Sequence, residues 1–278
     1  MFRTIQLPSG EAVPALGQGT WQLGEDSSKR RAEITALQLG IELGMTLLDT
    51  AEMYGEGRTE ELVGEAIAGR RDGVFIVSKV LPQNASRQGT VKACERSLRR
   101  LKIDHIDLYL LHWRGSYPLA DTVAAFDELL QAGKIRHWGV SNFDLSDMEE
   151  LASLHPSVPA ATNQVLYNLS RRGIEFDLLP YCEQHRMPIM AYSPIEQGRL
   201  LRNGALNKLA AQRGVSPAQI ALAWVLRRPA VIAIPRTGTV AHVRENRAAL
   251  DLELSEAELA SLDQAFPQPG KKHSLEML

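Results

Sequence analysis

Eight short apolar runs recur along the chain at a nearly regular interval, and this interval limits the fold more than any other feature. The runs cover residues 15–17, 45–49, 74–79, 105–112, 135–141, 161–167, 188–193 and 231–235. Successive runs begin 26 to 31 residues apart, except that the eighth begins 43 residues after the seventh. Most of them lack the apolar–polar alternation of a half-exposed strand, which favours strands buried on both faces of a parallel sheet.

Amphipathic segments with helical periodicity separate the runs. They cover residues 29–43, 59–68, 90–101, 121–132 and 147–154, and Ser216 with Pro217 begins another helix. Eight such strand–helix units predict an α/β protein with a single (β/α)₈ TIM barrel spanning residues 1–278. We further expect an N-terminal β-hairpin at 4–16 that plugs the barrel, a C-terminal helix from Ser255, and a tail at 268–278 that is flexible or borders the pocket.

A doubly wound open sheet is the alternative architecture. Gly17, Gly19 and Gly24 superficially resemble the glycine-rich turn that binds dinucleotides in such sheets. The third glycine is misplaced for that turn, however, and the following helix begins only near Lys29. The barrel therefore remains the favoured prediction.

Charge and cysteine content exclude several classes of protein. The 31 lysines and arginines nearly balance the 33 acidic residues, which argues against a nucleic-acid or membrane partner. Cys94 and Cys182 lack the spacing of a zinc site, so we expect reduced thiols and no metal. Without a signal peptide or an apolar run long enough to span a bilayer, the sequence predicts a cytoplasmic protein, and we expect a monomer.

Polar residues end the apolar runs, and catalytic groups of such barrels lie at the C-terminal ends of strands. Asp49 and Lys79 each end a run, His112 ends another, and Tyr54 follows Asp49 closely. A lysine ammonium lowers the pKa of a nearby tyrosine, and a buried lysine needs a carboxylate partner. We therefore predict that Tyr54 donates a proton, that Asp49 pairs with Lys79, and that His112 orients a carbonyl oxygen.

Each of these four residues also has a purely structural interpretation. Asp49 resembles a helix N-cap, and Tyr54 resembles an ordinary loop aromatic. Lys79 and His112 are harder to explain in this way, because each ends a strand predicted to be buried.

Several motifs together resemble the aldo-keto reductase family. They are DTAEMYG at 49–55, IVSK at 76–79, DLYLLHW at 107–113, GKIRHWGVSNF at 133–143, NQV at 163–165, AYSP at 191–194 and IPRT at 234–237. They occur in the family's order, and the resemblance extends from about residue 4 to residue 266. The short loops are similar to those of a bacterial branch that includes methylglyoxal reductases and diketogluconate reductases.

The resemblance implies a role for each matching residue. Tyr54 is the implied general acid, with Asp49, Lys79 and His112 as the other catalytic residues, and Tyr192 stacks on a nicotinamide ring. The implied cofactor-binding residues are Gly19, Thr20, Trp21, Asp49, Ser141, Asn142, Gln164, Tyr192, Ser193, Pro194, Ile195, Gly198, Ile234, Arg236, Thr237, His242, Glu245 and Asn246. The implied substrate pocket is lined by Trp21, by Met53 or Glu52, and by Tyr54, His112 and Trp113.

Two departures from the family pattern refine the expected activity. Arg236 provides a cation for the 2′-phosphate of NADPH, but His242 stands where many NADPH-binding members carry a second arginine. We therefore expect NADPH to be preferred over a more weakly bound NADH. Only residues 113–118 separate His112 from the next predicted helix, which predicts an open pocket for small aldehydes and dicarbonyls.

Two other functions compete with reduction by hydride transfer. Some relatives of this fold are non-catalytic regulatory proteins that bind a nicotinamide nucleotide, although all four catalytic residue types are present here. The other is a Schiff-base aldolase that uses Lys79, which would require a lysine of lowered pKa. The predicted ion pair with Asp49 has the opposite effect on that pKa.

Overall fold

In the computed structural model, which describes residues 3–154 and 156–278, eight parallel strands form one sheet that curls into a barrel. The strands are β3 (Gln18–Gly19), β4 (Leu47–Asp49), β5 (Phe75–Val80), β6 (Ile106–Leu111), β7 (Ile135–Ser141), β8 (Asn163–Leu166), β9 (Ile189–Tyr192) and β10 (Val231–Ala233). Each strand pairs with its neighbour in sequence. The predicted α/β barrel is therefore confirmed.

The first and last strands close the barrel. Leu16 bridges Ala233 and Gly19 bridges Arg236, both in parallel. The Gly17 N–H donates to the Ala233 carbonyl at 2.9 Å, and the Gly19 N–H donates to the Pro235 carbonyl at 3.0 Å. The predicted run 15–17 thus belongs to this seam, whereas the regular strand that pairs with β4 begins three residues later than predicted.

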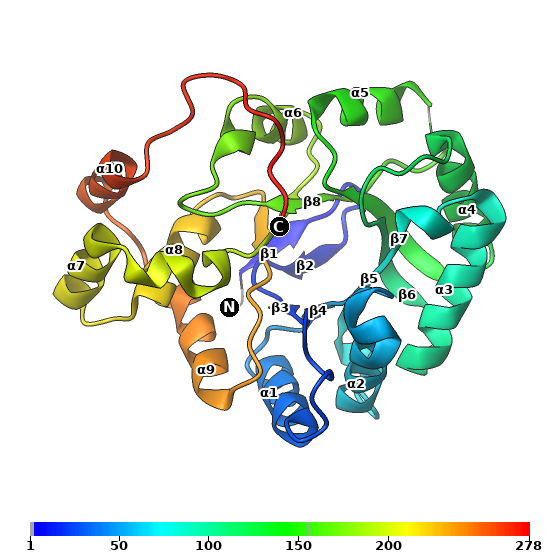
Figure 1. Cartoon of the computed structure of the whole chain (residues 1–278), viewed down its shortest axis with the longest axis horizontal. Coiled ribbons are helices and arrows are strands. Elements are labelled where there is room, and N and C mark those ends of the chain that lie inside the picture. Colours follow the sequence, from blue (N-terminus) through cyan, green and yellow to red (C-terminus); the bar gives the residue numbers. More distant parts are fainter. Residues whose placement is uncertain (1–2, 155) are drawn as a thin grey trace.

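Helices surround the strands (Figure 1). They are α1 (Arg30–Glu42), α2 (Arg58–Ala66), α3 (Arg87–Leu101), α4 (Leu119–Gln131), α5 (Leu145–Ser153), α6 (Leu178–Gln184), α7 (Gly204–Arg213), α8 (Pro217–Leu226), α9 (Val240–Ala248) and α10 (Glu256–Ala265). Ser216 and Ser255 cap α8 and α10 through capping boxes, as their sequence context indicates. No helix within the described ranges is long and apolar enough to cross a membrane.

The N-terminal hairpin covers one end of the barrel, as predicted. Strands β1 (Thr4–Gln6) and β2 (Ala12–Pro14) pair antiparallel and lie within the ring of strands in Figure 1. Glu11 accepts hydrogen bonds from Arg136 and His137, which occupy the N-terminal end of β7. The hairpin therefore plugs the N-terminal end of the barrel.

The C-terminal tail returns from α10 across the other end of the barrel (Figure 1). Lys272 pairs with Asp177 at 3.0 Å, Glu276 pairs with Arg171, and Leu275 packs against the hydrophobic core. Lys272, Leu275 and Glu276 of the tail thus contact the barrel, and whether the rest of 268–278 is flexible or borders the pocket stays a prediction.

Candidate active site

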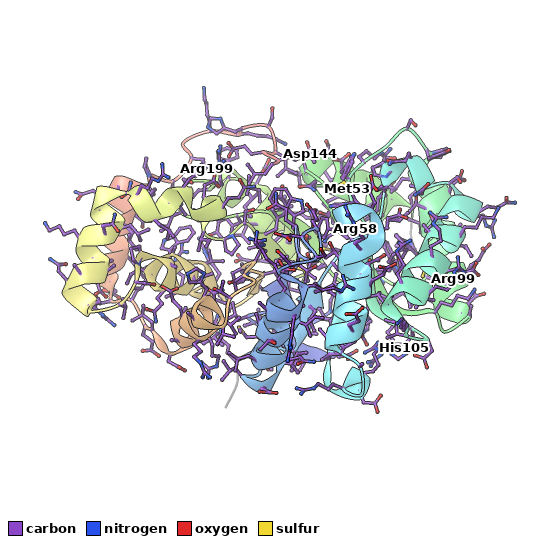
Figure 2. All side chains as sticks on the ribbon, turned by 60° about the horizontal axis from the view of Figure 1, so that its bottom comes forward. Met53, Arg58, Arg99, His105, Asp144 and Arg199 are labelled. Atoms are coloured by element: carbon purple, nitrogen blue, oxygen red, sulfur yellow. The ribbon has the colours of Figure 1, made fainter. Side chains whose placement is uncertain are left out.

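The strands deliver the predicted catalytic groups to one end of the barrel. Asp49 is the last residue of β4, Lys79 is the penultimate residue of β5, and His112 directly follows β6. Figure 2 shows Met53, Asp144 and Arg199, which follow β4, β7 and β9, toward the edge crossed by the tail. His105, which precedes β6, lies toward the opposite edge.

Lys79 is the centre of the constellation. Its Nζ atom donates to Asp49 Oδ2 at 2.9 Å, to the Thr50 carbonyl at 2.9 Å and to the Tyr54 hydroxyl at 3.1 Å. The Lys79 side chain is fully buried, and Asp49 is 3% exposed. Three acceptors surrounding one ammonium satisfy its donors and compensate for the loss of hydration.

The pKa values of this group are set by competing effects. Burial disfavours the Lys79 ammonium, but the charge of Asp49 and the hydrogen bonds to Asp49 and Tyr54 outweigh it, so the pKa of Lys79 rises. For Tyr54, burial raises the pKa and the Lys79 charge opposes this effect without overcoming it. The expected lowering of the Tyr54 pKa is therefore wrong for the net shift, because the sequence did not reveal how strongly the hydroxyl is desolvated.

His112 is a neutral imidazole beside Tyr54. Burial, with a contribution from the Lys79 charge, lowers the pKa of His112 from 6.5 to about 2. Its ring meets that of Tyr54 edge to face, with ring centroids 5.9 Å apart. The ring centroids of His112 and Trp113 are 4.7 Å apart. A neutral imidazole retains one N–H donor, so His112 can bind a carbonyl oxygen through a hydrogen bond.

A second cluster joins the ends of β7, β8 and β9. The Asn142 amide donates to the His112 carbonyl at 3.1 Å and accepts from the Tyr192 hydroxyl at 3.0 Å. Gln164 donates to Asp49 Oδ1 at 2.7 Å, and Ser141 donates to the Gln164 carbonyl at 2.9 Å. These hydrogen bonds connect the amide-bearing cluster to the Lys79 constellation and fix its side chains around one face of the site.

The barrel seam brings another group of predicted residues together. The Thr20 hydroxyl donates to the Asp49 carbonyl at 2.8 Å, and Arg236 Nε donates to the Trp21 carbonyl at 3.0 Å. A Cβ atom at Gly19 would lie 2.7 Å from the Ile234 carbonyl oxygen, so only glycine permits this close approach. Arg236 is exposed, and its hydrogen bond to Trp21 uses only the Nε atom of the guanidinium group.

The loop after β9 has an unusual backbone. Ser193, Glu196 and Gln197 have φ values of 47°, 52° and 53°, which side-chain-bearing residues rarely adopt. Asn168 supports this conformation by donating to the Ser193 carbonyl at 2.9 Å and to Glu196 at 2.8 Å. The predicted residues Pro194, Ile195 and Gly198 lie in the same loop.

The predicted residues for the adenosine end lie beyond β10. Thr237 follows Arg236, and His242, Glu245 and Asn246 belong to the first two turns of α9. His242 is exposed, and Asn246 is buried. His242, Glu245 and Asn246 thus lie on the helix that follows the eighth strand, and Thr237 lies in the loop before it.

Most of the residues predicted to line the substrate pocket are exposed or half-buried, whereas His112 is buried. Trp21 is 40% exposed and Met53 is 38% exposed, while Trp113 is half-buried beside His112. Glu52, the alternative to Met53, is buried and accepts a hydrogen bond from the Leu81 backbone N–H. The next helix begins at Leu119, which agrees with the predicted short loop at 113–118.

Sequence reasoning missed a contact between the tail and this site. Arg171, after β8, donates to Glu196 Oε1 at 3.0 Å through Nη2 and to Glu276 at 2.5 Å through Nη1. Burial raises the pKa of Tyr192 to about 12, and the Leu278 backbone lies close enough to oppose that shift. No local pattern marks Arg171, because its partners are distant in sequence.

The fold and these residues define a reductase barrel, and comparison with known proteins establishes its family. The sequence profile of the Aldo/keto reductase family matches residues 15–266, and the chain belongs to that family. It is 54% identical over 281 residues to a methylglyoxal reductase of Escherichia coli, covering 99% of both chains. It is 35% identical to a glyoxal reductase of Bacillus subtilis, covering 94% of this chain and 91% of that one.

Solved structures agree with this assignment. An aldo-keto reductase of Klebsiella pneumoniae, crystallised in complex with NADPH, has a TM-score of 0.96 and 49% sequence identity and covers 100% of both chains. A second structure of an aldo-keto reductase from the same organism, in complex with NADP and acetate, has a TM-score of 0.95.

Proposed function

We propose that this protein reduces small aldehydes and dicarbonyls of the methylglyoxal type to alcohols with NADPH. The single observation that carries the proposal is the Lys79 ammonium, held between the Asp49 carboxylate and the Tyr54 hydroxyl. A phenol beside an ammonium group can lose its proton to an oxygen on which negative charge develops. The similarity to a methylglyoxal reductase and a glyoxal reductase supports the substrate class.

The residues of the site have complementary tasks in this reaction. Because its pKa is raised, Tyr54 holds its proton at neutral pH and has it available for the carbonyl oxygen. NADPH, when bound, supplies the hydride that is added to the carbonyl carbon. Lys79 then stabilises the phenolate on Tyr54, while neutral His112 donates a hydrogen bond that orients the carbonyl oxygen.

The site residues fit a nicotinamide dinucleotide. Asn142, Ser141 and Gln164 present amide and hydroxyl groups to a carboxamide, and Tyr192 presents a ring to the nicotinamide. The loop 193–198 and the start of α9 lie after the seventh and eighth strands of the barrel, where barrels commonly bind phosphate. The exposed Arg236 guanidinium supports the preference for NADPH.

The short segment 113–118 supports small substrates, because it forms no long wall beside His112. Nitrobenzaldehyde and methylglyoxal should therefore be better substrates than bulky steroids. We also propose that residues 1–278 form one domain.

The aldolase alternative is not supported by the environment of Lys79. A Schiff-base lysine must lose its proton readily, but the raised pKa of Lys79 keeps its ammonium charged. Borohydride in the presence of a carbonyl substrate should therefore leave Lys79 unmodified, and covalent trapping there would favour the aldolase.

Replacing Tyr54 with phenylalanine tests the proposal. Tyr54→Phe should lower kcat for methylglyoxal reduction by at least about 10²-fold, because the general acid is lost. NADPH binding should change little, and Tm should fall because the buried Lys79 ammonium loses one of its three acceptors. Tyr181→Phe, on α6 and half-buried, is the matched control and should retain wild-type turnover. Unchanged turnover in Tyr54→Phe would overturn the proposed function.

A further inference from the structure

Glu52 is a buried carboxylate close to the proposed active site. It lies between Asp49 and Tyr54, and only 6% of its side chain is exposed. Burying a carboxylate costs several kcal/mol unless hydrogen bonds and an opposite charge replace the lost water. Its partners therefore indicate what the burial achieves.

The Glu52 carboxylate binds the segment that follows Lys79. Its Oε1 atom accepts from the Leu81 backbone N–H at 2.8 Å and from the Asn84 amide at 2.9 Å. Its Oε2 atom pairs with Arg96 of α3 at 3.2 Å. The Glu52 backbone N–H also donates to the Lys79 carbonyl at 3.3 Å. One residue thus joins the segment carrying Tyr54 to the segment carrying Lys79.

Tyr54 needs such a connection because no regular element holds it. It begins the 3₁₀ turn Tyr54–Gly57, in which Gly55, Glu56 and Gly57 all have positive φ values of 54°, 57° and 94°. Lys79, by contrast, is fixed within the barrel strand β5. The distance between Lys79 Nζ and the Tyr54 hydroxyl therefore depends on how the segment 50–54 is attached to β5 and the residues after it.

We infer that Glu52 is a positioning residue that sets the Tyr54 hydroxyl against the Lys79 ammonium. The inference rests on the proposed role of Tyr54 as general acid. The Glu52 carboxylate has no bond to Tyr54 or Lys79 and acts through the placement of the two segments. Displacing a reacting group by about 1 Å can cost about 10²-fold in rate.

Two substitutions at Glu52 separate its contacts. Glu52→Ala removes all three side-chain contacts and should lower kcat about 10- to 100-fold. Glu52→Gln retains a carbonyl oxygen that can accept from Leu81 and Asn84, so it should recover most of the lost kcat. Neither should alter the Kd for NADPH. The kcat–pH profile of Glu52→Ala should also change, because Lys79 no longer interacts with Tyr54 at the same distance.

Glu60→Ala is a matched control for lost stability. Glu60 is fully buried on α2, accepts from Ser78 at 2.6 Å and pairs with Arg100 on the same helix α3. Its loss should lower Tm with kcat and the kcat–pH profile of the folded enzyme retained. If Glu60→Ala reproduces the kinetic changes of Glu52→Ala, the role assigned to Glu52 is wrong.

A double-mutant cycle with Tyr54→Phe provides the decisive measurement. If Glu52 acts through the Tyr54 hydroxyl, Glu52→Ala should have little further effect on kcat once that hydroxyl is absent. An equal fold-loss in both backgrounds overturns the inference. The inference is also overturned if Glu52→Ala keeps the wild-type kcat while Tyr54→Phe has a lowered kcat. Unimpaired Tyr54→Phe is a different result, which overturns the proposed function itself.

Discussion

The burial of His112 makes the free energy of unfolding depend on pH. In the unfolded chain an ordinary histidine takes up a proton near pH 6.5, whereas in the fold the pKa of His112 is lowered to about 2. Between these values the unfolded state binds the extra proton, so folding stability falls as the pH falls. His112 alone should remove about 1.4 kcal/mol of stability per pH unit well below pH 6.5.

Urea unfolding of the wild type and of His112→Gln at pH 4, 5, 6 and 7 measures this contribution. The variant should show a shallower dependence of the free energy of unfolding on pH, by about one proton between pH 4 and 6. Parallel curves for the two proteins would contradict a neutral, buried His112. At pH 8 and above the two slopes should coincide, because His112 is then almost fully uncharged in both states.

Arg236 should decide the choice of cofactor. Its exposed guanidinium can bind the 2′-phosphate that distinguishes NADPH from NADH. Arg236→Met should therefore lower kcat/KM for NADPH about 10- to 100-fold, the effect of losing a charge-assisted hydrogen bond, and leave NADH little changed. Arg213→Met, which breaks an ion pair with Glu258, is a control that should affect neither cofactor. A wild-type preference for NADH would refute the assignment of Arg236.

At the scale of elements, the seam between β3 and β10 tolerates no side chain. A Cβ atom at Gly19 would meet the Ile234 carbonyl oxygen at 2.7 Å, so the strands would have to separate. Gly19→Ala should lower the free energy of unfolding by about 1–3 kcal/mol, the usual cost of overpacking. Gly73→Ala has open space around it and should be close to neutral. Equal free energies of unfolding of Gly19→Ala and Gly73→Ala in urea would show that the strands at the seam can move apart at little cost.

The strands were predictable because burial on both faces leaves uninterrupted apolar runs. The proposed catalytic set followed from them, because the carboxyl ends of parallel barrel strands meet at one edge. Helices α6, α7 and α9 were not predicted. Helix α6 is only seven residues long, and α7 and α9 mix charged and apolar residues with weak periodicity. The long gap before the eighth run contains both α7 and α8.

Two features of the site could not be predicted from any local pattern. The net pKa shift of Tyr54 depends on how completely the fold desolvates its hydroxyl, which no spacing reveals. The burial of the Glu52 side chain depends on its partners Leu81, Asn84 and Arg96, which are distant in sequence. Adjacent residues of one motif thus differ in burial, because Met53 is exposed and Glu52 is buried.

At the scale of the whole molecule, Arg171 connects the tail to the loop after β9. It binds both Glu196 and Glu276, so its loss should loosen the loop proposed to hold the cofactor's phosphates. Arg171→Met should raise the Kd for NADPH about 3- to 10-fold through lost preorganisation. Tryptophan fluorescence on titration with NADPH measures this change.

Two further variants isolate the tail. Glu276→Gln weakens only the contact between the tail and Arg171, whereas Arg199→Met weakens only a second contact with Glu196. Each should raise the Kd less than Arg171→Met does. If Glu276→Gln alone matches Arg171→Met, the tail rather than the loop governs binding.

The two ends of the barrel differ in what can be attached to them. Arg3 donates to the Arg228 carbonyl, just before β10, so Arg3 lies at the plugged end. The last residues lie at Tyr192, on the open end. An affinity tag or surface linker joined after Leu278 would emerge beside the proposed active site, whereas one joined on the side of Arg3 would be attached at the opposite end of the barrel. Immobilisation of this enzyme for synthesis is therefore better made through its N-terminal side.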